Sequence, residues 1–133
     1  MISISDIASV ARAVFSGADY KAKARATMIS TFNAVRQRVE DQGQKLQGIP
    51  EDSRIHSPYL TGLLNEIEYL AQLVREKDVA MQIFESYYGS TFLIYYDTHL
   101  PDMLAIRKEQ PNAFEHILWL ERQMRPWRHL DAS

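Results

Sequence analysis

Cysteine is absent from the 133 residues of this chain. Its absence excludes disulfide scaffolds, zinc sites with thiolate ligands, iron–sulfur clusters and thiol nucleophiles. An excess of positive charge is absent too, because the formal net charge is −2, and this disfavours a generally basic nucleic-acid binder. Hydrophobic residues make up 46% and charged residues 24% of the chain. These are ordinary values for a globular protein, so we expect one domain over residues 1–133.

The sequence also lacks a long apolar run. The longest strongly apolar stretch covers residues 92–96, whereas a helix that spans a membrane needs about 18 such residues. The N-terminal residues do not have the pattern of a secretory signal, because Asp6 is the first charge and Arg12 interrupts the apolar stretch. We therefore expect no membrane span, and the default prediction is a cytoplasmic protein.

Apolar residues recur at helical spacing in five segments, and no strand pattern competes with them convincingly. The segments cover residues 5–15, 20–41 and 58–75, a stretch that follows Asp78, and a last stretch between Asn112 and Pro126. Most loops between them are short, which favours neighbouring helices that run antiparallel. The prediction is an all-α fold, an antiparallel bundle of four or five helices.

The first two helices have recognisable ends. The amphipathic segment 5–15 is expected to stop at Gly17 and to pack on the bundle, with a helix lying in a membrane interface as the alternative. Asp19 is expected to cap the second helix. Its predicted buried face consists of Tyr20, Ala24, Met28, Phe32, Val35 and Val39. Two glycines and Pro50 then mark a polar loop over residues 43–54.

The third and fourth helices also carry start signals. Ser57 followed by Pro58 predicts the start of the third helix, with serine as the cap and proline at the first helical position. Asp78 is expected to cap the fourth helix. Because proline interrupts helices, we expect a kink or a break between residue 98 and Pro101.

The last helix has the clearest signals. Asn112 at the cap and Glu115 three residues later resemble a capping box, and Pro126 is expected to end the helix. Upstream, the small residues 89–91 interrupt an aromatic helix. We expect them to relieve crowding between helices rather than to supply a nucleophile.

Two stretches carry a resemblance to a known kind of domain. LLNEIEYLAQLV at residues 63–74 places Asn-x-x-Glu on an apolar helix, and DMLAIRKEQPNAFEHILWLERQ at residues 102–123 ends one helix in Arg before a Phe- and Leu-rich helix. Over about residues 19–124 the chain resembles an uncharacterised bacterial helical domain family. This resemblance implies the helical fold and an origin in bacteria or their mobile elements. Members commonly carry an N-terminal membrane anchor, where this chain has the amphipathic segment 5–15.

The usual motifs of catalytic and metal sites are missing. None of the four histidines has a glutamate three positions before it, as a di-iron bundle requires, and no nucleophile elbow or phosphate-binding glycine loop occurs. His99 and Asp102 form the one carboxylate–imidazole pair worth naming, for which we expect surface hydrogen bonding. Glu66 and Glu68 should point to different faces, with Glu68 in solvent. We predict no catalytic residue, no metal ligand and no cofactor.

The C-terminal sequence RQMRPWRH combines planar cations with an indole. Arg122, Arg125 and Arg128 surround Trp127, and arginine and tryptophan are residue types that dominate binding hot spots. We predict that these four residues bind a partner, together with Tyr96 as an outward-facing aromatic. The alternative is that Trp127 folds back on the bundle and leaves the arginines in solvent.

Three functions remain open. The leading hypothesis is a non-catalytic protein–protein interaction module of bacterial or mobile-element origin, from a phage or plasmid, that blocks or scaffolds a host complex or binds itself. The second is a small helical ribonuclease, because Arg122-x6-His129 resembles the Arg, four to six residues, His spacing of the prokaryotic nucleotide-binding class. There arginine would hold phosphate and histidine would act as general base. The third is RNA binding by the arginine and tryptophan tail.

Overall fold

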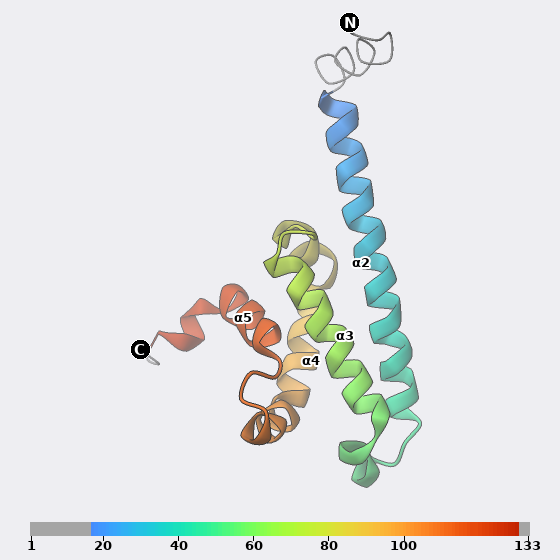
Figure 1. Ribbon diagram of the computed structural model, residues 1–133, viewed down its shortest axis with the longest axis vertical. Coiled ribbons are helices and arrows are strands. Elements are labelled where there is room, and N and C mark those ends of the chain that lie inside the picture. Colours follow the sequence, from blue (N-terminus) through green and yellow to red (C-terminus); the bar gives the residue numbers. More distant parts are fainter. Residues whose placement is uncertain (1–16, 131–133) are drawn as a thin grey trace, which may run out of the picture.

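The computed structural model describes residues 17–130, and within this range the chain forms four α-helices and two short 3₁₀ helices, with no strand. Figure 1 shows α3 in the middle, with α2 on one side, α5 on the other and α4 behind. The predicted all-α bundle is confirmed. The helix predicted over residues 5–15 lies outside the described residues.

The longest helix, α2 (Gly17–Gln47), packs antiparallel against α3 (Pro58–Arg75). Arg38 of α2 donates to Glu66 of α3 at 2.9 Å, whereas Gln42, one turn further along α2, faces the earlier residue Gly62 of α3. The contacts on α3 therefore move backward as those on α2 move forward. From residue 20 onward, the buried hydrophobic side chains of α2 are Phe32, Val35, Val39 and Leu46.

The predicted limits of α2 are wrong at both ends. Residues from Gly17 onward are helical, so Gly17, expected to end a preceding helix, and Asp19, expected to cap the second helix, both lie within α2. At the other end, α2 continues through Gly43, which the sequence predicts to lie in a loop. Packing explains why a glycine stands at this helical position. A β-carbon at Gly43 would lie only 3.1 Å from the hydroxyl oxygen of Tyr95. The glycine allows the helix that carries Tyr95 to approach α2 closely.

The first turns of α2 extend past the other helices (Figure 1). Residues 20–27 are all exposed, including Tyr20 and Ala24, which the apolar series predicts to be buried. Spacing shows which face of a helix is apolar but not how far a neighbouring helix covers it. Within residues 17–130, the fully buried part of that face begins at Phe32.

The start of α3 agrees with its prediction. Ser57 accepts the backbone N–H of Tyr59 through its side chain at 3.1 Å, and Pro58 occupies the first helical position. The preceding polar segment forms the 3₁₀ helix η1 (Glu51–His56). Because α2 and α5 both pack on α3, most of its apolar residues are buried, namely Leu60, Leu63, Leu64, Ile67, Leu70, Ala71, Leu73 and Val74.

Helix α4 (Met81–Glu109) begins later than predicted, after Ala80. The backbone amides of Asp78 and Val79 both donate to the carbonyl of Leu73, at 2.9 and 3.2 Å. These residues therefore complete the turn that ends α3, and Asp78 is not the cap of α4.

Near Pro101 the sequence predicts a kink or a break, and the break does not occur, because α4 continues to Glu109 with Pro101 inside it. Pro101 lies exposed, so its ring displaces no core residue. Buried residues before and after it, Tyr96 and Met103, hold both halves of the helix on the core, and this packing offsets the one backbone hydrogen bond that proline removes.

Helix α5 (Glu115–Met124) takes its N-terminal cap from another helix. Phe114 precedes it in the left-handed conformation (φ 60°), and the predicted capping box at Asn112 is absent. Instead, the carboxylate of Glu68 on α3 accepts the backbone N–H groups of Ile117 at 2.9 Å and His116 at 3.4 Å. Burial raises the pKa of Glu68, and these two hydrogen bonds partly oppose that rise. The prediction that Glu68 faces solvent is therefore wrong.

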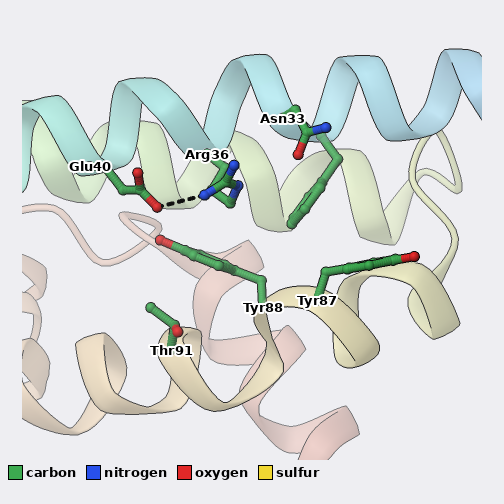
Figure 2. A pocket seen from close by; sticks show the side chains of 7 residues that line it. Asn33, Arg36, Glu40, Tyr87, Tyr88 and Thr91 are labelled. Atoms are coloured by element: carbon green, nitrogen blue, oxygen red, sulfur yellow. Dashed lines mark hydrogen bonds and ion pairs between the residues drawn. The ribbon is translucent and has the colours of Figure 1, made fainter.

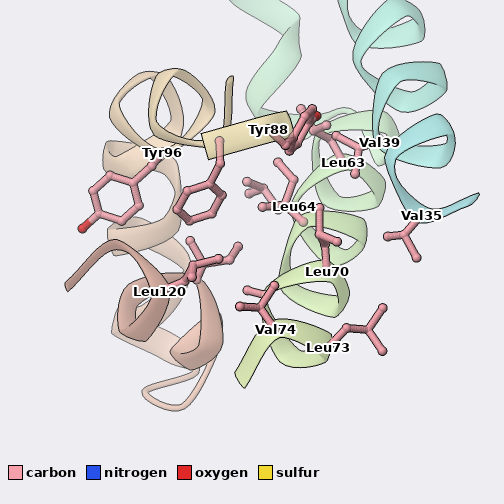
Figure 3. Packing of buried hydrophobic residues seen from close by; sticks show 14 of the residues in the cluster. Val35, Val39, Leu63, Leu64, Leu70, Leu73, Val74, Tyr88, Tyr96 and Leu120 are labelled. Carbon is pink, nitrogen blue, oxygen red and sulfur yellow. The ribbon is translucent and has the colours of Figure 1, made fainter. Parts of the chain in front are cut away.

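Aromatic rings join α2 to α4 in the core. The ring of Phe32 lies edge-on to Phe84 and Tyr88, with centroids 6.4 and 5.9 Å away. Figure 3 shows the leucines of α3 between Val39 on one side and Tyr96 and Leu120 on the other.

A β-carbon at Gly89 would lie 3.1 Å from the terminal methyl of Met124. The expected relief of crowding between helices is thus confirmed at Gly89.

Of the helices described over residues 17–130, none combines the length and the apolar character needed to cross a bilayer.

Candidate partner-binding surface

The chain leaves α5 through a short 3₁₀ helix, η2 (Pro126–His129). The last helical residue of α5 is Met124 and proline follows two residues later, as the sequence predicts. Residues immediately before and at the end of η2 hold this segment against α4 and α5.

Arg125 anchors the start of η2. Its two terminal nitrogens donate to the two carboxylate oxygens of Asp97 on α4, at 3.0 and 2.9 Å, and its Nε donates to Oε1 of Glu121 at 3.1 Å. The guanidinium also lies over the ring of Tyr96, 5.4 Å from the centroid. Its side chain is only 11% exposed. The charge of Arg125 is therefore satisfied inside the molecule instead of being offered to a partner.

Glu121 contacts the residues at both ends of η2, Arg125 and His129. Its side chain is 1% exposed, and while one oxygen accepts from Arg125, the other lies 2.6 Å from Nε2 of His129. Both oxygens of this buried carboxylate thus have partners, as a charge removed from water requires.

Asp97 strengthens the same anchoring from α4. Besides its two bonds to Arg125, it accepts from Arg128 at 3.4 Å. The hydrogen bond from Arg125 is the main reason that the pKa of Asp97 is lowered, and the same bond raises the pKa of Arg125. Both groups therefore keep their charges, and the tie persists, from neutral pH into the acidic range.

Trp127 lies between these anchored residues and is 65% exposed. The alternative in which it folds back on the bundle is therefore wrong. Leu130 follows η2 and is exposed as well, and half of the Arg128 side chain is accessible. We name Trp127, Arg128 and Leu130 the tail surface. Arg122 lies exposed on α5, and among residues 17–130 it has no ion-pair partner.

Tyr96 does not belong to this surface. The sequence predicts an outward-facing aromatic, but the residue is 6% exposed and packs against Phe92, with ring centroids 6.4 Å apart. Burial raises the pKa of its hydroxyl. Because it is buried, Tyr96 is not available to contact a partner. Its ring instead packs against the guanidinium of Arg125.

The two residues of the ribonuclease spacing lie on different elements. Arg122 is on α5 and His129 is on η2, where Nε2 of the imidazole faces the buried carboxylate of Glu121. The turn at Pro126 separates the pair.

The other candidate pairs have structural partners. Nδ1 of His99 lies 3.3 Å from a carboxylate oxygen of Asp102, and the imidazole stacks on Tyr95. The side chains of His99 and Asp102 are 15% and 26% exposed. This hydrogen bond is therefore partly buried, whereas the sequence predicts it on the surface. Glu66 pairs with Arg38. Over the part of the chain that the structure describes, no three histidine or carboxylate groups converge as a metal site requires.

Two residues that organise the tail were missed by the sequence analysis. Glu121 stands four positions before Arg125, a helical spacing that typically indicates an ion pair, and this signal was available. Asp97 lies 28 positions before Arg125 on a different helix, and no local pattern links them.

A family model described as a domain of unknown function, DUF4760, matches residues 5–124. The chain belongs to this family. The match confirms the resemblance to an uncharacterised domain family, and it begins further toward the N-terminus than the resemblance does, so that it includes residues 5–15. No curated protein and no solved structure matches the chain.

Proposed function

We propose that this protein is a non-catalytic protein–protein interaction module whose tail surface binds a protein partner. The observation that carries the proposal is an indole left exposed on a segment that is anchored on both sides. Arg125 and Arg128 bond to Asp97, and His129 bonds to Glu121. Trp127 stands between these contacts and takes part in none of them.

Anchoring the backbone favours binding because it reduces the entropy that association would otherwise cost. An exposed tryptophan on a flexible tail must be ordered when it binds, whereas Trp127 is held on an ordered turn in the unbound protein. Tryptophans that fill a pocket on a partner typically contribute about 2 kcal/mol or more to binding. The tail surface therefore has the properties of a hot spot prepared in advance.

The charges around Trp127 favour a protein partner over nucleic acid. Of the three arginines, Arg125 is satisfied by Asp97 and Glu121, and Arg128 shares Asp97. These two carboxylates offset much of the positive charge that phosphates would need. Arg122 and the accessible half of Arg128 are suited to carboxylates at the rim of an apolar pocket.

A role in blocking or scaffolding a host complex fits a module of this kind, and an origin in a bacterium or mobile element would agree with it. RNA binding and ribonuclease activity at Arg122 and His129 are the alternatives. They predict a nucleic acid, and not a protein, as the molecule recovered with the tail.

The proposal is tested by capturing tagged protein from cells of the source organism, with and without nuclease treatment. Trp127→Ala is compared with Tyr20→Ala, a matched loss of an exposed aromatic at the far end of the molecule. We expect a nuclease-resistant protein, or a second copy of the chain, to be retained by the wild type and by Tyr20→Ala. Trp127→Ala should weaken its binding about thirtyfold.

Three results would contradict the proposal. Equal recovery of the partner with Trp127→Ala and Tyr20→Ala would remove the tail surface from the interface. A nuclease-sensitive complex, or RNA cleavage lost in Arg122→Ala and His129→Ala, would favour the RNA alternatives.

A further inference from the structure

A cavity of about 240 Å³ lies between α2 and α4, away from the tail surface. It is lined by Phe32, Asn33, Arg36 and Glu40 from α2 and by Tyr87, Tyr88 and Thr91 from α4. Since one molecule of liquid water occupies about 30 Å³, this space corresponds to roughly eight waters or a small organic molecule.

The hydroxyl of Tyr88 is a buried polar group without a partner in the protein. The residue is 4% exposed, and its oxygen makes no hydrogen bond within the described residues. Leaving such a group unpaired costs about 1–3 kcal/mol, so a buried hydroxyl that lines a cavity is evidence for a bonding partner inside it. Burial raises the pKa of Tyr88, which keeps the hydroxyl protonated and able to donate at neutral pH.

Charges of both signs stand beside this hydroxyl. Arg36 donates to Glu40 at 2.8 Å, and both side chains remain about one-third exposed. Figure 2 shows the ring of Tyr88 pointing from α4 toward this ion pair, with Thr91 below and Asn33 above. The residues that line the cavity thus offer a cation, an anion and neutral hydrogen-bonding groups, among them those of Asn33, Tyr88 and Thr91.

We propose that this cavity binds a small zwitterion, a free α-amino acid or a molecule with the same two charged groups. The carboxylate of the ligand pairs with Arg36, its ammonium pairs with Glu40, and one of its polar atoms bonds to the hydroxyl of Tyr88. The rings of Phe32 and Tyr87 provide apolar surface for a side chain.

A ligand with one charge fits this arrangement less well. A plain anion would meet the carboxylate of Glu40, and a plain cation would meet the guanidinium of Arg36. A zwitterion places its carboxylate against Arg36 and its ammonium against Glu40. These contacts replace the water that the two side chains lose when the ligand binds. Charge complementarity therefore selects the class of ligand.

The site is tested by titration calorimetry of the full chain with the proteinogenic amino acids, one at a time. We expect at least one of them to bind. Its N-acetyl derivative lacks the ammonium and its amide lacks the carboxylate, so both should fail to bind. Arg36→Gln and Tyr88→Phe should weaken binding about tenfold or more.

Arg38→Gln is the matched control, because Arg38 is also an ion-paired arginine of α2 but bonds to Glu66 and does not line the cavity. Its affinity should equal that of the wild type. If Tyr88→Phe fails to fold, Arg36→Gln decides. The proposal is overturned if no amino acid binds, if the blocked derivatives bind equally well, or if Arg36→Gln and Arg38→Gln behave alike.

Discussion

Glu121 is a single carboxylate on which the geometry of the C-terminal segment depends. It is almost fully buried, and its two oxygens bond to Arg125 and His129. Removing one member of a buried charge cluster leaves the others uncompensated, which is costlier than losing a surface ion pair.

We predict that Glu121→Gln lowers the free energy of unfolding by about 3 kcal/mol, whereas Trp127→Ala changes it by less than about 0.5 kcal/mol. Urea denaturation of the two variants measures both effects. If the free energy of unfolding of Glu121→Gln equals that of the wild type, the contacts of Glu121 with Arg125 and His129 contribute nothing to stability.

Asp97 should make the stability of the protein depend on pH in the acidic range. Its pKa in the folded protein is lowered from the ordinary value of an aspartate, chiefly by the hydrogen bond from Arg125. A carboxyl group with a lowered pKa contributes stability above its unfolded pKa and loses that contribution as pH falls through its folded pKa.

The free energy of unfolding should therefore fall below about pH 4, and Asp97→Asn should lose part of that fall. Denaturation of both proteins between about pH 2 and 6 provides the measurement. Parallel curves for the two would contradict the role assigned to Asp97.

At the scale of helices, the sequence predicted α3 well because its start signals are local. Ser57 caps the helix through its own side chain and Pro58 takes the first position. The start of α5 was predicted wrongly, because its cap is Glu68, 47 positions before the helix begins at Glu115. Local rules describe the ends that neighbouring residues make, and they fail where another helix supplies the partner.

Glu68→Ala should destabilise the protein by about 1–2 kcal/mol, because it leaves the first amides of α5 without an acceptor. Glu68→Gln keeps an acceptor oxygen and should recover most of that loss. Thermal or urea denaturation of the two variants tests this assignment, and an equal loss in both would attribute the effect to charge and not to capping.

Glycine and proline were also harder to interpret than the apolar spacing. Gly43 predicted a loop, yet it lies within α2 where Tyr95 approaches. Pro101 predicted a kink or a break, yet α4 continues through it without a break. In both cases tertiary packing overrides the local preference, and the sequence contains no direct sign of which helices meet.

For the molecule as a whole, α3 holds the structure together and the first turns of α2 stand apart. Residues 20–27 are exposed, whereas one face of the same helix is buried from Phe32 onward. Helices without packed neighbours are only marginally stable in water.

We therefore predict two classes of amide hydrogen exchange within α2. Amides of residues 20–27 should exchange much faster than those of residues 35–46, which open with the core. Exchange followed by mass spectrometry measures the difference, and uniform protection along α2 would mean that another chain covers its first turns.

The candidate surface was predictable in its composition but not in its geometry. The arginines and the tryptophan of RQMRPWRH predict a binding surface in this segment, and Trp127 is exposed there. The geometry was not predictable, because Arg125 pairs with Asp97 of α4 and with Glu121 of α5. The guanidinium of Arg125 also lies over the ring of the buried residue Tyr96.

The most direct test of the central claim is photo-crosslinking in cells of the source organism. A photoreactive phenylalanine analogue is placed at position 127, and at position 20 as the control. We predict a discrete protein adduct, resistant to nuclease, from position 127 alone. No adduct at position 127, the same adduct from both positions, or an adduct that nuclease removes would contradict a protein-binding role for the tail surface.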